Sequence, residues 1–448
     1  MKTMDSKKST LSSIKLCLES RTGLLGFTQR SQAQGLRAFT YFGMATNQTS
    51  RSLEKLRLLA AEILAEVHHT EHTLEESMTR VLTRTSSKTF EAFDRSWLFE
   101  VCSGVLRYRG RLDYMIDTYA LKKKPAGELR RLLQIAVFQL LAQDVEAALV
   151  VSETVHVIRT AESQAPSQFA NAILRKIAGA RQEWRDWKVT ESSPFLEQLA
   201  WSSLPEWLFK KLRKERGSPW VFAFAEAILK RPQIWYRTRK ETLLLEKGFR
   251  GDEPEGFVQD ISNQKLVEEV VHFLKDRFQS KPKILDLCSA PGGKALALAY
   301  AGFSVIATDH NQERMQRVIE NRSRLKLENE IEIRDYDKVI DGEERYDVIW
   351  IDAPCSSTGI VRRHPEIKWN RTFSDVERVA LAQQVLQEWA SRHLTPNGVV
   401  IYSTCSLLSL ENQACLRLNV MKTLEWNPAR EPFGDGIFAM YLVAKNAL

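Results

Sequence analysis

The sequence contains few cysteines and no long hydrophobic run. Its six cysteines are spread over 448 residues, and no two of them form a C-x-x-C pair. A disulfide scaffold or a zinc ribbon is therefore not expected, and the thiols should be reduced, as they are in the cytosol. No stretch approaches the roughly 20 consecutive apolar residues of a membrane-spanning helix. We therefore expect a cytoplasmic protein without a membrane span and without a metal site.

Length and composition are those of a globular protein with several domains. The chain has room for about three domains of roughly 150 residues each. Hydrophobic residues make up 44% and charged residues 27%, which are ordinary proportions for globular proteins. A chain of this size can build its cores without disulfide support.

The net charge of +8 is concentrated in two segments. Residues 1–50 carry seven basic and two acidic side chains, and residues 205–250 carry twelve basic and five acidic ones. The second segment also contains Trp207, Trp220 and Trp235, so it could attract phosphates and stack on bases. Solvated helix faces with aromatic side chains in the core would explain the same composition, and we slightly favour that interpretation.

The first 50 residues lack the pattern of a folded core. They are rich in Ser, Thr, Gln and Arg, poor in acidic residues, and without a sustained apolar period. This composition predicts a disordered extension. A weak similarity to a transit peptide and a true initiator at Met44 are alternative explanations. We favour a disordered or spurious extension over targeting to an organelle.

Residues 51–182 are predicted to form an all-α domain of some five to seven helices. Strand-like alternation is missing here, and Pro125, Gly127 and Pro166 indicate breaks between helices. The clearest helix has apolar residues spaced by three and four positions, which places them on one face. These residues are Leu129, Leu132, Leu133, Ala136, Val137, Leu140 and Leu141.

Residues 183–260 are predicted to be a basic helical linker, or a subdomain that recognises RNA. A helical block runs from 194 to 230, where an Arg-Pro pair stops it. A short strand is expected at 234–238 and an irregular passage at 251–260.

Residues 261–448 are predicted to be an α/β domain. After a helix at 263–277, short β-rich runs alternate with helical patterns, which predicts a parallel, doubly wound sheet. The expected strands are 283–287, 304–308, 331–333, 346–351 and 399–403, and the expected helices are 294–302, 311–326 and 374–393.

A glycine turn follows the first of these strands. This pattern of strand, turn and helix is typical of a site where a nucleotide-like ligand crosses the edge of a sheet. A phosphate-binding P-loop fits poorly, because no Ser or Thr follows the lysine of the turn. Asp309 ends the next strand, 23 residues after Asp286, where an acid can bind both hydroxyls of a ribose. The pattern indicates an adenosine-containing cofactor, although a redox dinucleotide or a purely structural turn would also fit. The turn comprises Cys288, Ser289, Ala290, Pro291, Gly292, Gly293 and Lys294.

Two cysteines follow two neighbouring strands of the predicted sheet. Cys355 comes three residues after Asp352, and Cys405 lies in a Tyr-Ser-Thr-Cys-Ser stretch. Both lie in polar loops at the carboxyl ends of strands, where open α/β sheets build their sites. A single buried thiol is usually an inert part of a core. Two thiols at one crevice favour catalysis over packing.

These motifs resemble the Sun family of RNA cytosine-C5 methyltransferases. Residues 352–369 look in particular like the subfamily that methylates small-subunit ribosomal RNA (rRNA), and residues 402–406 and 435–438 agree with it. In the N-terminal half, residues 104–107 and 169–176 are similar to the NusB-like RNA-binding fold that this subfamily carries. The resemblance covers about residues 51–448. It has small departures, since the family usually has Ala at Ser289 and Gly at Ser357, and the linker is shorter than the family's RNA-recognition subdomain.

The resemblance implies an all-α NusB-like N-terminal domain and a C-terminal Rossmann-like class I methyltransferase domain. It further implies that S-adenosylmethionine is the cofactor and small-subunit (16S) rRNA the partner. By the same resemblance Cys405 is the nucleophile that adds to C6 of cytosine, Cys355 assists product release, and Asp352 hydrogen-bonds N3. We expect a monomer.

The expected cofactor contacts follow the same resemblance. Residues 288–294 would hold the methionine part, Asp309 the ribose, Asp335 the adenine edge and Asp352 the region near the sulfonium. Asp337 is a rival for the adenine contact, and Lys294 is expected to orient Asp352. The alternatives are the same chemistry on tRNA or another rRNA, and a non-catalytic RNA-binding factor.

Overall fold

The computed structural model describes residues 47–69, 72–85, 92–121, 123–143, 145–240, 242–244 and 256–445. The predicted extension over residues 1–50 therefore lies, up to residue 46, outside the described residues. The chain forms two compact units. In the described part of the chain, the helical unit comprises residues 47–230 with 361–370, and the sheet unit comprises residues 231–360 with 371–445.

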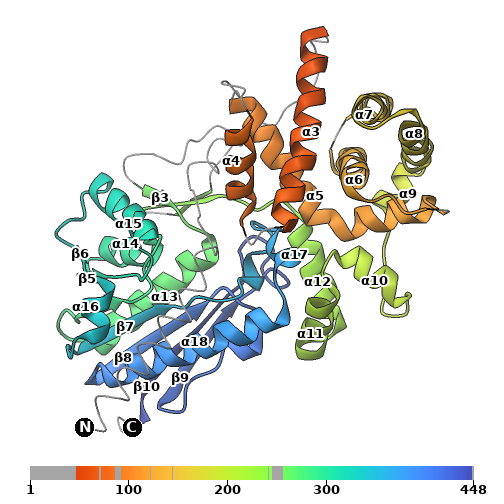
Figure 1. Ribbon diagram of the computed structural model, residues 1–448. Coiled ribbons are helices and arrows are strands. Elements are labelled where there is room, and N and C mark those ends of the chain that lie inside the picture. The colour runs from red at the N-terminus through yellow and green to blue at the C-terminus, as the bar shows by residue number, and fades with distance from the viewer. Residues whose placement is uncertain are drawn as a thin grey trace, which may run out of the picture. The chain divides into compact units, whose positions relative to one another are not determined.

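The described part of the helical unit consists of helices, as the apolar periodicity predicts. In α6 the residues of the predicted stripe are buried from Leu132 to Leu140, which confirms that this face packs in the core. No helix among the described residues is both long and apolar enough to cross a membrane. The helices (Figure 1) are α3 (Asn47–His69), α4 (Leu74–Arg84), α5 (Ala92–Tyr119), α6 (Gly127–Ala142), α7 (Ala147–Ala161), α8 (Gln164–Gly179), α9 (Arg181–Arg185), α10 (Phe195–Ser202), α11 (Glu206–Arg216), α12 (Ser218–Leu229) and α17 (Ile367–Asn370).

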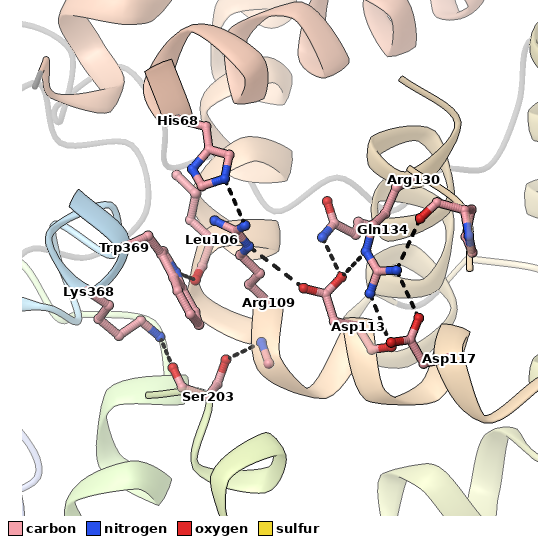
Figure 2. Close-up of polar contacts among 12 residues, drawn as sticks. His68, Leu106, Arg109, Asp113, Asp117, Arg130, Gln134, Ser203, Lys368 and Trp369 are labelled. Atoms are coloured by element: carbon pink, nitrogen blue, oxygen red, sulfur yellow. Dashed lines mark hydrogen bonds and ion pairs between the residues drawn. The ribbon is translucent and has the colours of Figure 1, made fainter. Parts of the chain in front are cut away.

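A charged network joins α5 to α6 (Figure 2). Arg130 of α6 donates from Nε to Asp113 at 2.8 Å and from Nη1 to Asp117 at 2.8 Å. Gln134, one turn further along α6, donates to the same Asp113 carboxylate at 2.7 Å. Since these side chains are only partly exposed, the network orients α6 on α5 with bonds that water competes for weakly.

A ten-residue segment from the second half of the chain is part of the helical unit. We call it the crossing segment (residues 361–370), because the chain belongs to the sheet unit before and after it. In the sequence, the resemblance of this stretch to the family favours small-subunit rRNA as the substrate. In the structure it packs as a structural part of the helical unit.

Lys368 and Trp369 hold the crossing segment in place (Figure 2). Lys368 is buried, and its Nζ donates to the carbonyl oxygens of Arg107 at 2.7 Å and Ser203 at 2.9 Å. Burial lowers the pKa of Lys368 well below its usual range, which favours the neutral amine. Trp369 Nε1 donates to the carbonyl oxygen of Leu106 at 2.8 Å, and its ring packs against the helical core.

The sheet unit contains a seven-stranded mixed sheet in the order β6-β5-β4-β7-β8-β10-β9. Strands β4 to β8 run parallel, as predicted, whereas β10 pairs antiparallel with both β8 and β9. The alternation of strands and helices had not predicted this antiparallel edge. The strands are β4 (Ile284–Asp286), β5 (Val305–Ala307), β6 (Ile331–Ile333), β7 (Tyr346–Asp352), β8 (Leu394–Thr404), β9 (Leu418–Trp426) and β10 (Ile437–Ala444).

Helices cover both faces of this sheet (Figure 1). Alternate strand residues point to opposite faces: Val348 and Trp350 pack in one core, while Ile349 and Ile351 pack in the other. The first core takes residues from α13 (Ile261–Arg277), α14 (Gly293–Tyr300) and α15 (Gln312–Arg324). The second takes residues from α16 (Tyr336–Asp341) and α18 (Phe373–Arg392).

A second, three-stranded sheet precedes α13. It has the order β2-β1-β3, with β1 (Trp235–Thr238), β2 (Thr242–Leu244) and β3 (Gly256–Val258). β1 confirms the predicted short strand. The prediction of an irregular passage at 251–260 was wrong for β3, whose pairing with β1 is antiparallel and joins segments about 20 residues apart. A strand of three residues is too short to show an alternating pattern in the sequence, so this pairing could not be predicted.

Candidate active site

The glycine turn lies between the carboxyl end of β4 and the start of α14. Ser289 N donates to the carbonyl oxygen of Thr308 at 3.0 Å, which fixes the turn against the end of β5. Gly292 has φ +102°, a backbone conformation that side-chain-bearing residues rarely adopt. Gln259 Nε2 donates to the carbonyl oxygen of Gly293 at 2.9 Å. The turn is thus held by hydrogen bonds on both sides.

Asp309 lies directly after β5 and points at this turn. Its Oδ2 accepts from Ala290 N at 3.1 Å, and its Oδ1 accepts from Asn311 N at 2.9 Å. The structure therefore brings Asp309 and the glycine turn together, as the ribose prediction requires. The neighbouring Thr308 hydroxyl is buried and has no hydrogen-bond partner among the described residues. A ligand bound at the turn could form hydrogen bonds with the Thr308 hydroxyl and with the remaining lone pairs of the Asp309 carboxylate.

Asp286 ends β4, and Cys288 is the first residue of the turn. Asp286 is fully buried, and burial raises the pKa of its carboxyl group to about 7. Burial likewise raises the pKa of the Cys288 thiol well above its usual range. The strand end below the turn is therefore a region of low polarity in which charged forms are disfavoured.

Asp352 ends β7 and is paired with a lysine of the glycine turn. Lys294 Nζ lies 2.6 Å from Asp352 Oδ2, and Ser403 Oγ donates to Asp352 Oδ1 at 3.0 Å. Ser403 in turn accepts from Trp350 Nε1 at 3.0 Å. Ser403 was not predicted from the sequence, although it lies two residues before Cys405. These contacts fix the orientation of the Asp352 carboxylate, as we expected for Lys294.

The two cysteines meet beyond β7 and β8. Their Sγ atoms are 3.1 Å apart, and Ser357 Oγ lies 3.5 Å from Cys405 Sγ and 3.9 Å from Cys355 Sγ. The hydrogen bond with Cys405 and burial raise the pKa of the Cys355 thiol well above its usual range. Cys405 is less buried than Cys355. The arrangement therefore pairs a thiol that stays protonated with one that a substrate can reach.

Ser357 has an unusual backbone. Its φ is +64°, in the left-handed region that favours glycine and costs other residues about 1–2 kcal/mol. This position is where the family usually has glycine. The serine keeps the conformation and adds a hydroxyl next to both sulfurs.

Asp335 is the residue predicted to contact the adenine edge. It follows β6 and caps α16, where its Oδ1 accepts from Lys338 N at 3.1 Å. Its side chain is exposed, and no described contact joins it to the glycine turn. Among the described residues, no group of three or more His, Cys, Asp or Glu is arranged to hold a metal ion.

Known proteins match both halves of the chain. Residues 274–435 match the family described as 16S rRNA methyltransferase RsmB/F, and residues 54–179 match the NusB family. The ribosomal RNA small subunit methyltransferase B of Cronobacter sakazakii is 30% identical over 407 residues, which cover 82% of this chain and 90% of that relative. The protein of the same name from Serratia proteamaculans is 32% identical over 363 residues, covering 72% and 81%.

The chain belongs to the RsmB/F family of 16S rRNA methyltransferases. Among solved structures, the crystal structure of PH0851 matches with a TM-score of 0.61 and 20% identity over 87% of this chain and 98% of that one. The predicted fold class, an all-α NusB-like domain with a Rossmann-like methyltransferase domain, is confirmed. The chain is an rRNA methyltransferase that uses S-adenosylmethionine, as the sequence analysis predicted.

The residues at the sheet edge fit this cofactor. Gly292 of the turn has φ +102°, an acid follows β5, and the buried Thr308 hydroxyl next to it lacks a protein partner within the described ranges. A hydroxyl without a partner is costly when buried, so a ligand that supplies one would stabilise this edge.

Proposed function

We propose that the protein methylates C5 of a cytosine in small-subunit (16S) rRNA through a covalent bond between Cys405 and C6. The observation that carries this proposal is the pair of thiols, 3.1 Å apart, at the ends of two adjacent strands. Methyl transfer to oxygen or to an amino group needs no thiol. A cytosine carbon does need one, because C5 of the free base is too weak a nucleophile.

The chemistry assigned to Cys405 is nucleophilic addition. Its thiolate forms a bond to C6, and C5 becomes enamine-like and accepts the methyl group that S-adenosylmethionine supplies when bound. Loss of the C5 proton to water, assisted by the Cys355 thiol, together with cleavage of the C6–S bond, releases the methylated base and the thiolate. Asp352, oriented by Lys294, accepts a hydrogen bond from N3–H and so stabilises the N3-protonated base, whose positive charge draws electron density away from C6.

The environments of the two thiols support this division of roles. Cys355 is buried and has a raised pKa, so it stays a neutral thiol, which is unsuited to attack C6 and leaves it the role in product release. Cys405 is the more accessible of the two, and an unstacked base must reach the nucleophile directly.

The proposed cofactor contacts follow the sheet edge. Cys288, Ser289, Ala290, Pro291, Gly292, Gly293 and Lys294 hold the methionine part, and Asp309 binds the ribose hydroxyls. Asp335 is assigned to the adenine edge with Asp337 as its rival, since both lie at the start of α16. Asp352 lies near the sulfonium.

The choice of substrate rests on the relatives. Those named ribosomal RNA small subunit methyltransferase B span most of the chain, which favours 16S rRNA over tRNA or another rRNA. We assign RNA binding to the helical unit, which contains the NusB match.

The proposal is tested by trapping the covalent intermediate. Cys355→Ala should still attack and methylate but stall before release, leaving protein attached to rRNA as a slowly migrating band that nuclease collapses. Cys405→Ala and the double variant should give no band and no methylation, whereas Cys415→Ala, a buried cysteine outside the two loops, serves as the control. Turnover by Cys405→Ala would refute the assignment, and a band in Cys405→Ala alone would reverse the two roles. Bisulfite sequencing of rRNA from a deletion strain would identify the target nucleotide.

A further inference from the structure

A buried glutamate joins the loops that carry the two cysteines. Glu411 is only 1% exposed and lies in a short 3₁₀ helix after β8, η2 (Ser409–Glu411). Its Oε1 accepts from Ser356 N at 2.6 Å, and its Oε2 accepts from Ser356 Oγ at 2.5 Å and also from Ser406 Oγ. Gln383 of α18 completes the set with a bond of 3.3 Å to Oε1.

Each serine that binds Glu411 is the residue after a cysteine. Ser356 follows Cys355, and Ser406 follows Cys405. One carboxylate therefore holds both loops immediately beside the sulfur-bearing residues. A displacement of either serine would carry its cysteine with it, because one peptide unit separates them.

The loop that carries Cys355 and the loop that carries Cys405 are closely packed against each other. Gly359 N donates to the carbonyl oxygen of Cys405 at 2.8 Å. A Cβ on Gly359 would lie 2.7 Å from that oxygen and 2.6 Å from the carbonyl oxygen of Gly436. The backbone beyond each cysteine is thus in contact with the other loop, so the geometry of the thiol pair depends on how the loops are joined.

The chemistry of Glu411 is unusual for a residue that only fills space. Burial raises the pKa of its carboxyl group, and no cation pairs with it among the described ion pairs, so its donors are neutral hydroxyl and amide groups. A buried acid held this way is costly unless it is fully hydrogen-bonded. An apolar side chain would fill the same volume at lower cost, but it could not accept bonds from both loops.

We infer that Glu411 is a positioning residue that sets the separation and orientation of Cys355 and Cys405. The inference rests on the proposed function of the two thiols. Glu411 does not touch the base or the cofactor; it acts through Ser356 and Ser406. Its loss should therefore impair the steps that use the thiols and leave the glycine turn unchanged.

The test compares Glu411→Ala and Glu411→Gln with Glu269→Ala, a partly exposed glutamate of the same unit. Because misplacement of reacting groups by about 1 Å can cost about a hundredfold, kcat of Glu411→Ala should fall by about that factor. The KM for rRNA and the Kd of S-adenosylmethionine should stay within about threefold. Glu411→Gln should lose less, since its amide oxygen still accepts from Ser356 N. In the Cys355→Ala background, Glu411→Ala should also slow formation of the trapped adduct.

A second measurement does not depend on activity. The rates at which iodoacetamide alkylates Cys355 and Cys405, followed by mass spectrometry on the full chain, should change severalfold in Glu411→Ala and not in Glu269→Ala. Unchanged alkylation rates and a kcat within about threefold of the wild type would overturn the inference. If Glu411→Ala fails to fold, the same two outcomes are decided with Glu411→Gln. If the wild type forms no methylated cytosine at all, the proposed function fails, and the alkylation rates still test Glu411.

Discussion

Ser357 shows how a single residue can combine backbone strain with a position at the active site. Strained residues persist where the surrounding structure fixes them, and such places are often functional. Here Thr358 next to it bonds the partner loop, since Leu407 N donates to Thr358 Oγ1 at 3.0 Å and Ser406 Oγ lies 3.3 Å from the same hydroxyl. The loop is therefore held in the left-handed turn even though the residue is not glycine.

Replacing Ser357 with glycine should stabilise the protein. Glycine adopts the observed φ of +64° without strain, so we expect a gain of about 1 kcal/mol in the free energy of unfolding, partly offset by the greater freedom of glycine in the unfolded chain. Ser357→Ala is the matched control, because it removes the hydroxyl and keeps the strain. Urea unfolding should rank glycine above alanine. Equal stability of the two variants would show that the strain is not significant.

At the residue scale, the sequence predicted those site residues that directly follow the end of a strand in the chain. The glycine turn, Asp309 and both cysteines each follow a predicted strand, and parallel strands bring such residues to one edge. Glu411 and Ser403 could not be assigned in the same way. The bonds of Glu411 come from two loops and α18, and only the folded chain brings these segments together.

At the scale of elements, strands were predictable where apolar residues dominate them. The buried strands β4, β5 and β7 read as short apolar runs in the sequence. β9 lies at the edge of the sheet, and its central residues, Val420 and Met421 among them, are exposed. β9 pairs with β10 alone, and its own sequence does not indicate that partner, so its place in the sheet depends on β10.

The contact between α5 and α6 through Arg130 was likewise not predictable from a local pattern, because its partners on α5 are 13 and 17 residues away. Arg130→Met keeps the apolar stem and leaves Asp113 and Asp117 without their main donor. We expect a loss of roughly 1–3 kcal/mol in the free energy of unfolding, since the carboxylates are only partly buried. Arg175→Met, at an exposed position of α8, should change stability little. A urea midpoint for Arg130→Met equal to that of this control would contradict the expectation.

At the scale of the whole molecule, the chain enters the helical unit twice. In the described part of the chain, the first passage covers residues 47–230, and the second is the crossing segment. The partners of Lys368 at Arg107 and Ser203 are 261 and 165 residues away in the chain. No local pattern can reveal such a contact, and the family resemblance alone suggested a role in choosing the substrate. The helical unit is therefore incomplete when only the N-terminal half is present.

A fragment that contains only the N-terminal half should be less stable than the complete helical unit. A chain of residues 45–230 retains most of the helical core but leaves the carbonyl oxygens of Arg107, Ser203 and Leu106 without their donors from the crossing segment. We expect a lower Tm than for the helical unit in the full chain, measured by circular dichroism at 222 nm. A synthetic peptide of residues 361–370 should raise the Tm in proportion to the logarithm of its concentration, because it binds only the folded fragment.

The same peptide with Lys368→Met and Trp369→Ala should have little effect, since it lacks both hydrogen-bond donors and the ring that packs on the core. Equal action of the two peptides would mean that the crossing segment contributes bulk and not these specific bonds. A fragment that melts at the temperature of the full chain and ignores both peptides would show that the N-terminal half is complete by itself. The physical reason to expect otherwise is that removing a hydrogen-bond partner from a buried group is costly, and the crossing segment supplies three such bonds from far along the chain.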